Sequence, residues 1–275
     1  MNSLSRCKPL LGTYVEINIE SEKDRETLLT LSTEAFAKIE RIEQLMSFHN
    51  PDSELSFINK HAFNYPCSLS LETETVIQTA LDISQITNGI FDVTIAPVLS
   101  AMGLLPDINV DTDESANWRD IDIQNEMIHF NKPLQIDLGG IAKGYAVDLA
   151  LSIFDDSDDV VINAGGDMKM SQWQNKIVGI RHPDLSKNKI IDIPMRAAAV
   201  ATSANYYLDG KSAIISPATK HAIKDDRSIS IFADNCMHAD ALTKVAFLHN
   251  QNESILNQYN ASIIKLSDDD TEVMK

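Results

Sequence analysis

A carboxylate and a hydroxyl stand three residues apart in the segment HADALTKVAF, at residues 238–247. On a helix, Asp240 and Thr243 would share a face, because residues three apart are neighbours there. Carboxylate and hydroxyl oxygens are hard ligands of the kind that Mg²⁺ accepts. The alternative is an ordinary helix N-terminus with Asp240 in the first turn, where the helix dipole favours a negative charge. For this segment taken alone, that alternative is the better interpretation.

A glycine-rich segment reads IDLGGIAKGYAVD over residues 136–148. Its pattern predicts an apolar strand that ends at Asp137, a turn at Gly139 and Gly140, and a helix that carries Lys143. Glycines at a helix start allow close approach to a ligand, and the free N–H groups there favour a phosphate. An ordinary strand–turn–helix connection explains the same pattern equally well.

The remaining candidate segments are weaker. VINAGGDM, at residues 161–168, predicts a strand followed by small residues that could admit a flat ring or a phosphate. A hairpin turn at the two glycines explains it as well. Residues 47–59, 89–97 and 201–203 each mix turn residues with small polar ones. His49, His182 and His221 are isolated, so we expect surface or hydrogen-bonded histidines.

The elements that must position these segments follow from hydrophobic periodicity. Residues 11–19 alternate as a strand does, with Val15, Ile17 and Ile19 on one face. Apolar residues from Leu28 to Met46 recur at helical spacing, with Ser21 and Asp24 as the expected cap. Further helices are expected at 72–88, ending at Gly89, and at 238–249, and a glycine-rich turn followed by a helix is expected over about 138–154. Short β-branched runs occur at 160–163, 176–180, 190–193, 199–203, 213–216 and 228–233. This order predicts an α+β fold, with helices packed on a mostly antiparallel sheet in one compact domain over residues 1–275.

Charge and cysteine content exclude several classes of protein. The 275 residues include 23 basic and 40 acidic side chains, a net charge of −17, and no basic run that would indicate a nucleic-acid binder. A dinucleotide ligand would need backbone N–H groups, a metal or nearby lysines to offset this charge. The three cysteines match no metal or disulfide pattern, and no secretory signal or membrane span is visible. We therefore expect a cytoplasmic protein.

Taken in order, the segments resemble the ApbE family of FAD:protein FMN transferases. No single segment is decisive, but eight in order are specific, and they run from residue 10 to residue 244. They are LLGTYVEI at 10–17, MSFHNPDSELSFIN at 46–59, TNGIFDVTIAP at 87–97, IDLGGIAKGYAVD at 136–148, VINAGGDM at 161–168, GIRHP at 179–183, VATS at 200–203 and ADALTK at 239–244.

The resemblance implies a single α+β domain that binds FAD in an elongated cleft, with Mg²⁺ beside the diphosphate. A serine or threonine hydroxyl of a target protein attacks the FMN phosphorus, and AMP leaves; some members only hydrolyse FAD. The implied partners are thus FAD as substrate and a flavin-accepting protein. In such chemistry, positioning and charge neutralisation supply most of the catalysis.

The resemblance also implies site residues. The metal would be held by the Ala142 carbonyl, by Asp240 and by position 244. We expect Asp240 and Lys244 to be the catalytic residues. The residues expected to bind the cofactor are Gly12, Thr13, Ser47, Phe48, Asp92, Thr94, Lys143, Asn163, Gly165, Gly166, Asp167, Thr202 and Ser203.

Two departures from the family pattern bear on activity. Position 244 is Lys, where the family often has Thr or Asp, and a cation cannot ligate Mg²⁺. Either Thr243 completes a metal site with Ala142 and Asp240, which we expect, or the Lys244 ammonium stands in for the metal. The segment SAIISPATK at 212–220 has Ala213, Ser216 and Lys220 where the family usually has His, Asp and Gly. Loss of a general base typically costs about 10²–10⁴-fold in rate.

Three functions remain open from the sequence. The first is an FMN transferase. The second is a relative that binds FAD without transferring FMN, as a carrier, a sensor or a slow hydrolase. The third is a structural or interaction protein whose pocket has lost its use.

Overall fold

The computed structural model describes residues 1–184, 186, 189–204, 212–249, 253–267 and 271–274. Contacts within the chain divide it into two compact units. The sheet unit comprises Met1–Arg41, Lys143–Lys211 and Lys224–Lys275, and the second unit comprises Ile42–Ala142 and Ser212–Ile223. A single domain over the whole chain stays a prediction.

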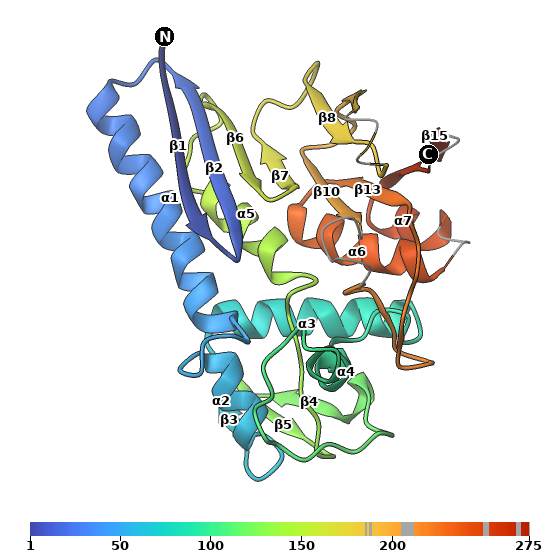
Figure 1. The fold of residues 1–275 in the computed structure, drawn as a ribbon. Helices are drawn as coiled ribbons and strands as arrows, with labels where there is room; N and C mark the ends of the chain where they lie inside the picture. Colours follow the sequence, from blue (N-terminus) through green and yellow to red (C-terminus); the bar gives the residue numbers. More distant parts are fainter. Residues whose placement is uncertain (185, 187–188, 205–211, 250–252, 268–270, 275) are drawn as a thin grey trace. The chain divides into compact units, whose positions relative to one another are not determined.

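The sheet unit is built on an eight-stranded sheet in which all neighbouring strands are antiparallel, so the predicted fold class is confirmed (Figure 1). The strand order is β1-β2-β6-β7-β10-β13-β14-β15. The bounds are β1 Asn2–Leu10, β2 Thr13–Ser21, β6 Asp159–Ala164, β7 Asp167–Met170, β10 Ala199–Ala204, β13 Ser228–Ala233, β14 Ser262–Leu266 and β15 Thr271–Met274.

Strand β2 carries the predicted alternation, and Val15, Ile17 and Ile19 are buried on one face. Strand β1, which the sequence reading missed, pairs with it through a two-residue turn at Leu11 and Gly12, where both φ angles are positive. Such turns match the twist of the strands they join. The predicted strand at 11–19 is thus displaced, because its first two residues form the turn.

The two faces of the sheet carry different residues, because directly paired residues in antiparallel strands point to the same side. The register Val15↔Ala164, Ala164↔Asp167 and Asp167↔Ala201 puts Asp167 on one face. Thr13 and Ser203 belong to that face as well, because residues two apart in a strand point the same way. Asn163, Met168, Val200 and Thr202 belong to the opposite face. We call the first one the helix face.

Both faces are covered around the middle of the sheet. Helix α6 (Cys236–Leu248) packs on β10 and β13 from the helix face. The hairpin of β8 (Ile177–Arg181) and β9 (Ile190–Pro194) covers the opposite face, and Val178, Ile180 and Ile193 join Val200 and Phe232 in one apolar cluster. Strand β13 is therefore buried along its whole length.

Three further helices belong wholly or mainly to the sheet unit. Helix α1 (Arg25–Met46) confirms the predicted helix, and the part of it that belongs to the sheet unit runs alongside β1 and β2 in Figure 1. Helix α5 is Ala142–Leu151 and follows a turn at residues 139–141, so the predicted turn and helix are confirmed. The helix predicted at 238–249 corresponds to α6, and a further helix that was not predicted, α7 (Glu253–Gln258), follows it.

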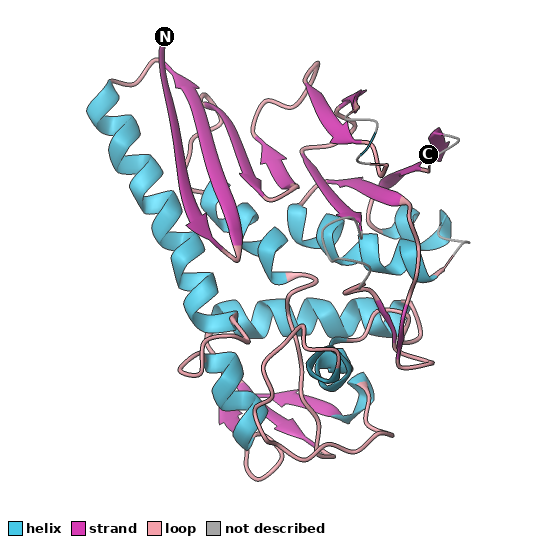
Figure 2. Cartoon of the chain, in the orientation of Figure 1, coloured by secondary structure: helices cyan, strands magenta, loops and turns pink. Residues whose placement is uncertain are grey.

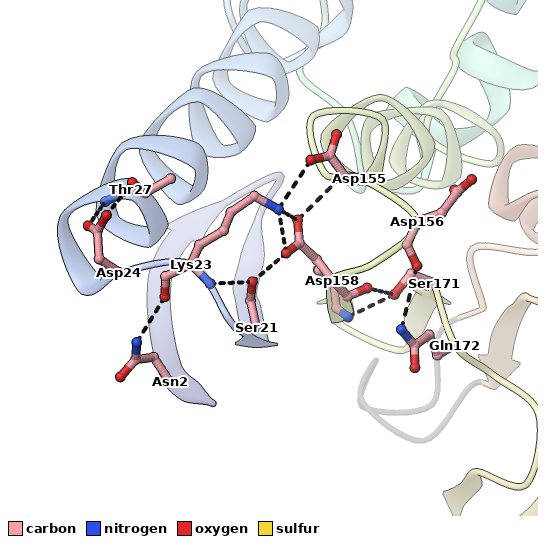
Figure 3. A network of polar contacts seen from close by, with 11 residues as sticks. Asn2, Ser21, Lys23, Asp24, Thr27, Asp155, Asp156, Asp158, Ser171 and Gln172 are labelled. Atoms are coloured by element: carbon pink, nitrogen blue, oxygen red, sulfur yellow. Dashed lines mark hydrogen bonds and ion pairs between the residues drawn. The ribbon is translucent and has the colours of Figure 1, made fainter.

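A buried carboxylate ties β2 to the loop before β6 (Figure 3). The fully buried Asp158 accepts hydrogen bonds from Ser21 Oγ at 2.5 Å and from Lys23 Nζ at 2.7 Å. Only one of the two predicted capping residues caps α1. Asp24 Oδ1 accepts a hydrogen bond from Thr27 N at 2.9 Å, whereas the Ser21 hydroxyl donates to Asp158. The acidic run at residues 155–159 therefore contains one buried carboxylate, that of Asp158.

The second unit is mainly helical (Figure 2). Helix α3 (Leu71–Ile86) confirms the predicted helix, and Gly89 N closes its end on Ser84 O at 2.7 Å. The other elements are α2 Glu54–His61, η1 Val93–Ile95, α4 Ala96–Ala101, η2 Trp118–Asp120, a small sheet of β3 Cys67–Ser68, β5 Met127–Phe130 and β4 Ile121–Gln124, and a hairpin of β11 Ile215–Ser216 and β12 His221–Ala222.

The strand expected to end at Asp137 is not formed. Its backbone hydrogen bonds go instead to the Asn59 side chain, whose Oδ1 and Nδ2 contact Ile136 N and O at 2.8 and 2.9 Å. Asp137 N donates to Val93 O at 2.8 Å. An amide side chain and a loop carbonyl thus replace a neighbouring strand, so the apolar run before Asp137 stays outside the sheets.

Candidate functional site

Two carboxylates and two ammonium groups form a cluster in the sheet unit, which we call the charge cluster. Asp167 begins β7 on the helix face, Lys143 lies in the first turn of α5, and Asp240 and Lys244 are one turn apart in α6. Lys143 Nζ pairs with Asp167 Oδ2 and lies 3.4 Å from Asp240 Oδ2. Lys244 Nζ pairs with Asp240 Oδ1. All four are predicted site residues, and the fold brings them together.

The cluster has a buried acidic side and a more exposed basic side. The side chains of Asp240 and Asp167 are 0% and 5% exposed, whereas those of Lys143 and Lys244 are 32% and 23% exposed. Two buried negative charges are tolerable because each is paired with an ammonium group. What a ligand meets here is therefore positive charge.

The pKa directions agree with this arrangement. Burial lowers the pKa of Lys143, but the charges of Asp167 and Asp240 outweigh burial and hold it above its ordinary value. Burial raises the pKa of Asp167, and the charge of Asp240 raises it further. Burial also acts to raise the pKa of Asp240, but Lys143 and Lys244 outweigh it and lower that pKa. Asp240 is thus the more acidic of the two carboxyl groups.

Backbone contacts fix α5 against α6. Gly144 N donates to Asp240 Oδ2 at 3.3 Å. A side chain at Gly144 would overlap the Cys236 carbonyl, so only glycine fits there. This close approach explains the glycine that follows Lys143 in the matched segment, and it is what lets residues from two helices share one cluster.

Asp148 is a supporting residue that the sequence reading missed. Its carboxylate oxygens accept from Cys236 N and Met237 N, both at 2.9 Å, and Lys169 Nζ pairs with it at 2.7 Å. Asp148 thus binds the first free N–H groups of α6, as carboxylates at helix N-termini do. The sequence signal was the i, i+4 spacing of Gly144 and Asp148, which places both on the face of α5 that contacts α6.

The predicted hydroxyl residues separate in the structure. Thr243 is fully buried; its Oγ1 donates to Asp240 O at 2.7 Å and is hydrogen-bonded to Ser203 Oγ, also at 2.7 Å. Thr202 points to the opposite face and is hydrogen-bonded through Oγ1 to Ser230 Oγ at 2.8 Å. The side chains of Thr202 and Ser203 therefore cannot both line one site.

The hairpin between β6 and β7 gathers a second set of predicted residues. Gly165 and Gly166 form its turn, with φ angles of 66° and 106°. A Cβ at Gly165 would lie 2.5 Å from Thr13 Oγ1, so the turn and the start of β2 touch. Asn163 Oδ1 accepts from Gly166 N at 3.0 Å. The hairpin interpretation of this segment is therefore confirmed. Gly12, another predicted site residue, likewise lies in a hairpin turn, the one between β1 and β2.

Five predicted residues lie in the second unit. Asp92 and Thr94 are buried: Asp92 Oδ1 accepts from the backbone N and the Oγ1 of Thr94, both at 2.8 Å, which caps η1. Burial raises the pKa of Asp92 in spite of these bonds. Phe48 is buried, Ser47 is half-buried, and Ala142 ends the unit's first segment. Any contact of these residues with FAD stays a prediction.

The departures from the family pattern in the segment 212–220 also lie in the second unit, whereas Lys244 belongs to the sheet unit. Ala213 is exposed and offers no ionisable group. Lys220 has a φ of 56° in the β11–β12 turn, which explains why glycine suits this position. The isolated histidines behave as expected: His49 and His221 are exposed, and His182 accepts from Asp184 N at 3.0 Å.

Comparison with known proteins decides the family. The sequence pattern of the ApbE family matches residues 11–263, most of the chain. The chain belongs to the ApbE family. A Vibrio cholerae protein named FAD:protein FMN transferase is 29% identical over 262 residues, which cover 85% of this chain and 78% of the relative. A Chlamydia pneumoniae protein of the same name is 28% identical over 258 residues, 86% of this chain and 79% of the relative.

Solved structures agree with the fold. An ApbE protein from Thermotoga maritima matches with a TM-score of 0.84 and 25% identity, over 100% of this chain and 97% of its own. The flavin transferase ApbE from Vibrio cholerae matches with a TM-score of 0.82 and 24% identity, over 99% of this chain and 96% of its own. The ApbE chain described here therefore has the fold that its sequence segments predicted.

Proposed function

We propose that this ApbE chain transfers FMN from FAD to a serine or threonine hydroxyl of a target protein and releases AMP. Family membership supports the reaction, since the curated relatives carry the name FAD:protein FMN transferase. The observation that carries the proposal in this chain is the charge cluster, because it offers two ammonium groups in a protein whose net charge is −17. A dinucleotide diphosphate is the kind of anion that such a place would attract.

The reaction needs charge stabilisation more than a covalent partner. The acceptor hydroxyl oxygen forms a bond to the FMN phosphorus, the bond from that phosphorus to the bridging oxygen breaks, and AMP keeps that oxygen. The hydroxyl proton passes to solvent. Lys143 and Lys244 would hold the diphosphate oxygens and stabilise the charge that grows on them during transfer. Asp167 and Asp240 would hold the two ammonium groups in place.

Mg²⁺ held by Ala142, Asp240 and Thr243 was the expected complement to these residues, and it remains untested. The surroundings of Asp240 and Thr243 do not fit it. Lysine ammonium groups contact both carboxylate oxygens of Asp240, and the Thr243 hydroxyl is buried and hydrogen-bonded to Asp240 O and Ser203 Oγ. Among the described residues, no group of three or more His, Cys, Asp or Glu side chains could hold a metal ion.

A second function has a specific observation in its favour. Ala213 is exposed where the family usually carries a histidine, so this chain has no imidazole at that position. A protein with this change could bind FAD as a carrier or sensor, or hydrolyse it slowly, without transferring FMN. General-base loss of this kind would slow the chemistry and leave binding intact.

The test of function follows both products. The purified protein is incubated with FAD and with the soluble proteins of its source organism, prepared from a strain that lacks this gene. AMP is measured by chromatography, and covalent flavin by fluorescence of denatured proteins on a gel and by peptide mass spectrometry. Transfer predicts AMP together with FMN on a serine or threonine.

The other outcomes separate the alternatives. AMP with free FMN, and no labelled protein, would indicate a hydrolase. FAD that co-purifies but stays intact would indicate a carrier or sensor. A colourless protein with no affinity for FAD would leave only the structural role.

None of the described helices combines the length and apolar character needed to cross a membrane, and a cytoplasmic location stays a prediction.

A further inference from the structure

The charge cluster is polarised although its formal charges sum to zero. The two carboxylates are almost completely buried, and the two ammonium groups retain about a quarter to a third of their exposure. An anion that approaches the cluster would meet Lys143 and Lys244 before it meets Asp167 or Asp240. The cluster is therefore already built to receive a phosphate group.

Each oxygen atom of Asp240 is already in contact with an ammonium group. Lys244 Nζ contacts Oδ1 and also lies 3.1 Å from the Asp240 carbonyl oxygen. Oδ2 accepts from Gly144 N at 3.3 Å and lies 3.4 Å from Lys143 Nζ. Mg²⁺ would have to stand about 2.1 Å from a ligand oxygen, where it would repel both ammonium groups strongly. A metal on Asp240 would thus require Lys244 to leave.

Thr243 cannot replace the ligand that position 244 lacks. Its side chain is fully buried, its proton goes to Asp240 O, and Ser203 supplies the second hydrogen bond. A metal that used this hydroxyl would have to displace the Ser203 bond inside the packing between α6 and β10. The Asp240 carboxylate and the Thr243 hydroxyl, which suggested Mg²⁺ in the sequence, are therefore both engaged in contacts within the protein.

We infer that this chain binds the diphosphate of FAD without a divalent metal, and that the ammonium groups of Lys143 and Lys244 take the place of the metal. The inference rests on the proposed function, because FAD is the ligand. An ammonium group has three protons. Lys244 uses one on Asp240 Oδ1 and one on Asp240 O, and Lys143 shares its protons between Asp167 and Asp240. Counting contacts among the described residues, each lysine thus keeps one proton for a phosphate oxygen.

The experiment measures FAD binding by calorimetry in EDTA and again in Mg²⁺. Wild-type affinity should agree within about twofold between the two buffers. Lys244→Thr should bind FAD at least about tenfold more weakly in EDTA, because a charged hydrogen-bond donor is lost. Mg²⁺ should restore most of that affinity, because the variant frees Asp240 Oδ1 and adds an oxygen one turn away.

Two further variants separate charge from folding. Lys244→Met removes the charge without offering a ligand, so its affinity should fall in both buffers and Mg²⁺ should not restore it. Lys176→Met removes an ammonium group from an ion pair of the same kind, with Asp159, outside the cluster, and should bind as the wild type does. Melting temperatures of all variants check that each one folds.

Metal binding gives a readout that does not involve FAD. Electron paramagnetic resonance of Mn²⁺ should detect no bound ion on the wild type alone and should detect one on Lys244→Thr. A wild type that binds Mn²⁺, or whose FAD affinity falls about tenfold in EDTA and returns with Mg²⁺, overturns the inference and leaves the proposed function standing. A wild type that binds FAD in neither buffer contradicts the proposed function and removes the inference with it.

Discussion

At the residue scale, each of two fully buried carboxylates, Asp158 and Asp240, is paired with lysine ammonium groups, but the two sites differ in how many they contain. Asp158 is fully buried in the sheet unit, and its ammonium partner Lys23 has a side chain that is 27% exposed. Asp240 is equally buried, but two ammonium groups, those of Lys143 and Lys244, contact it. The two sites therefore differ in the number of ammonium groups: Lys23 is shared by Asp158 and Asp155, whereas two lysines gather at Asp240, as binding of a diphosphate would need.

We expect Asp158→Asn to lower the free energy of unfolding by about 1–3 kcal/mol at neutral pH, since it weakens hydrogen bonds to a charged group in a buried place. Burial raises the pKa of Asp158, but Lys23 and Ser21 outweigh burial and lower it. A lowered pKa stabilises the fold above the unfolded value of about 3.9, and the gain is lost as pH falls through the folded pKa. Denaturation curves between neutral pH and acid should show the wild type and variant converging below about pH 4. A difference that is independent of pH would contradict this account.

At the scale of elements, the sequence predicted periodic segments well and long-range partners poorly. The stripe from Leu28 to Met46 gave α1, and β-branched runs gave β6, β10 and β13, because burial of one face or both leaves a regular pattern. Strand β1 was missed, because its inward residues include Arg6 and Lys8. The run before Asp137 was misread as a strand, since no local pattern reveals that Asn59 supplies its hydrogen bonds.

For the candidate site, the sequence likewise predicted which residues belong to it better than it predicted their long-range contacts. Segment order gave Lys143, Asp167, Asp240 and Lys244, which the fold brings together. It could not show that Thr202 and Ser203 face opposite ways, since that depends on the register of the sheet. It also gave Asp148 no role, because its partners on α6 are 88 and 89 residues away in the chain.

Packing between α5 and α6 predicts the effect of filling Gly144. Gly144→Ala would bring a methyl group onto the Cys236 carbonyl, which is backbone and cannot move aside alone, so we expect a loss of about 1–3 kcal/mol in chemical denaturation. Gly179→Ala is the matched control. Its methyl group would lie 2.7 Å from Ile190 Cγ2, a branch methyl of an exposed side chain that can rotate away about χ1, so we expect a smaller cost of about 0.5–1 kcal/mol. Equal costs for the two variants would contradict this packing.

The β11–β12 turn predicts a stabilising change. Lys220 has a φ of 56°, a conformation that costs a side chain energy and glycine almost none. Lys220→Gly should therefore raise the free energy of unfolding by about 0.5–1 kcal/mol. Lys60→Gly, on an exposed position of α2, should lower it by about 1 kcal/mol, because glycine is unfavourable within helices. The two variants changing stability in the same direction would disprove the assigned turn.

At the scale of the whole molecule, the chain combines a strong negative charge with a local positive place. Its net charge of −17 repels a dianionic ligand at long range, so binding must depend on short-range contacts. Lys143 and Lys244 supply such contacts in the sheet unit, and Asp167 and Asp240 hold them there. The family match over residues 11–263 extends across segments of both units, so the conclusion about family concerns the chain as a whole.

The central claim is that FAD, rather than FMN or another flavin, is the substrate. Calorimetry with FAD and then with FMN, in one buffer and on one preparation, tests it most directly. FAD presents a diphosphate to the two ammonium groups, whereas FMN has a single phosphate and lacks the AMP half. The account predicts that FAD binds at least about tenfold more tightly than FMN. Equal affinities, or tighter binding of FMN, would contradict it.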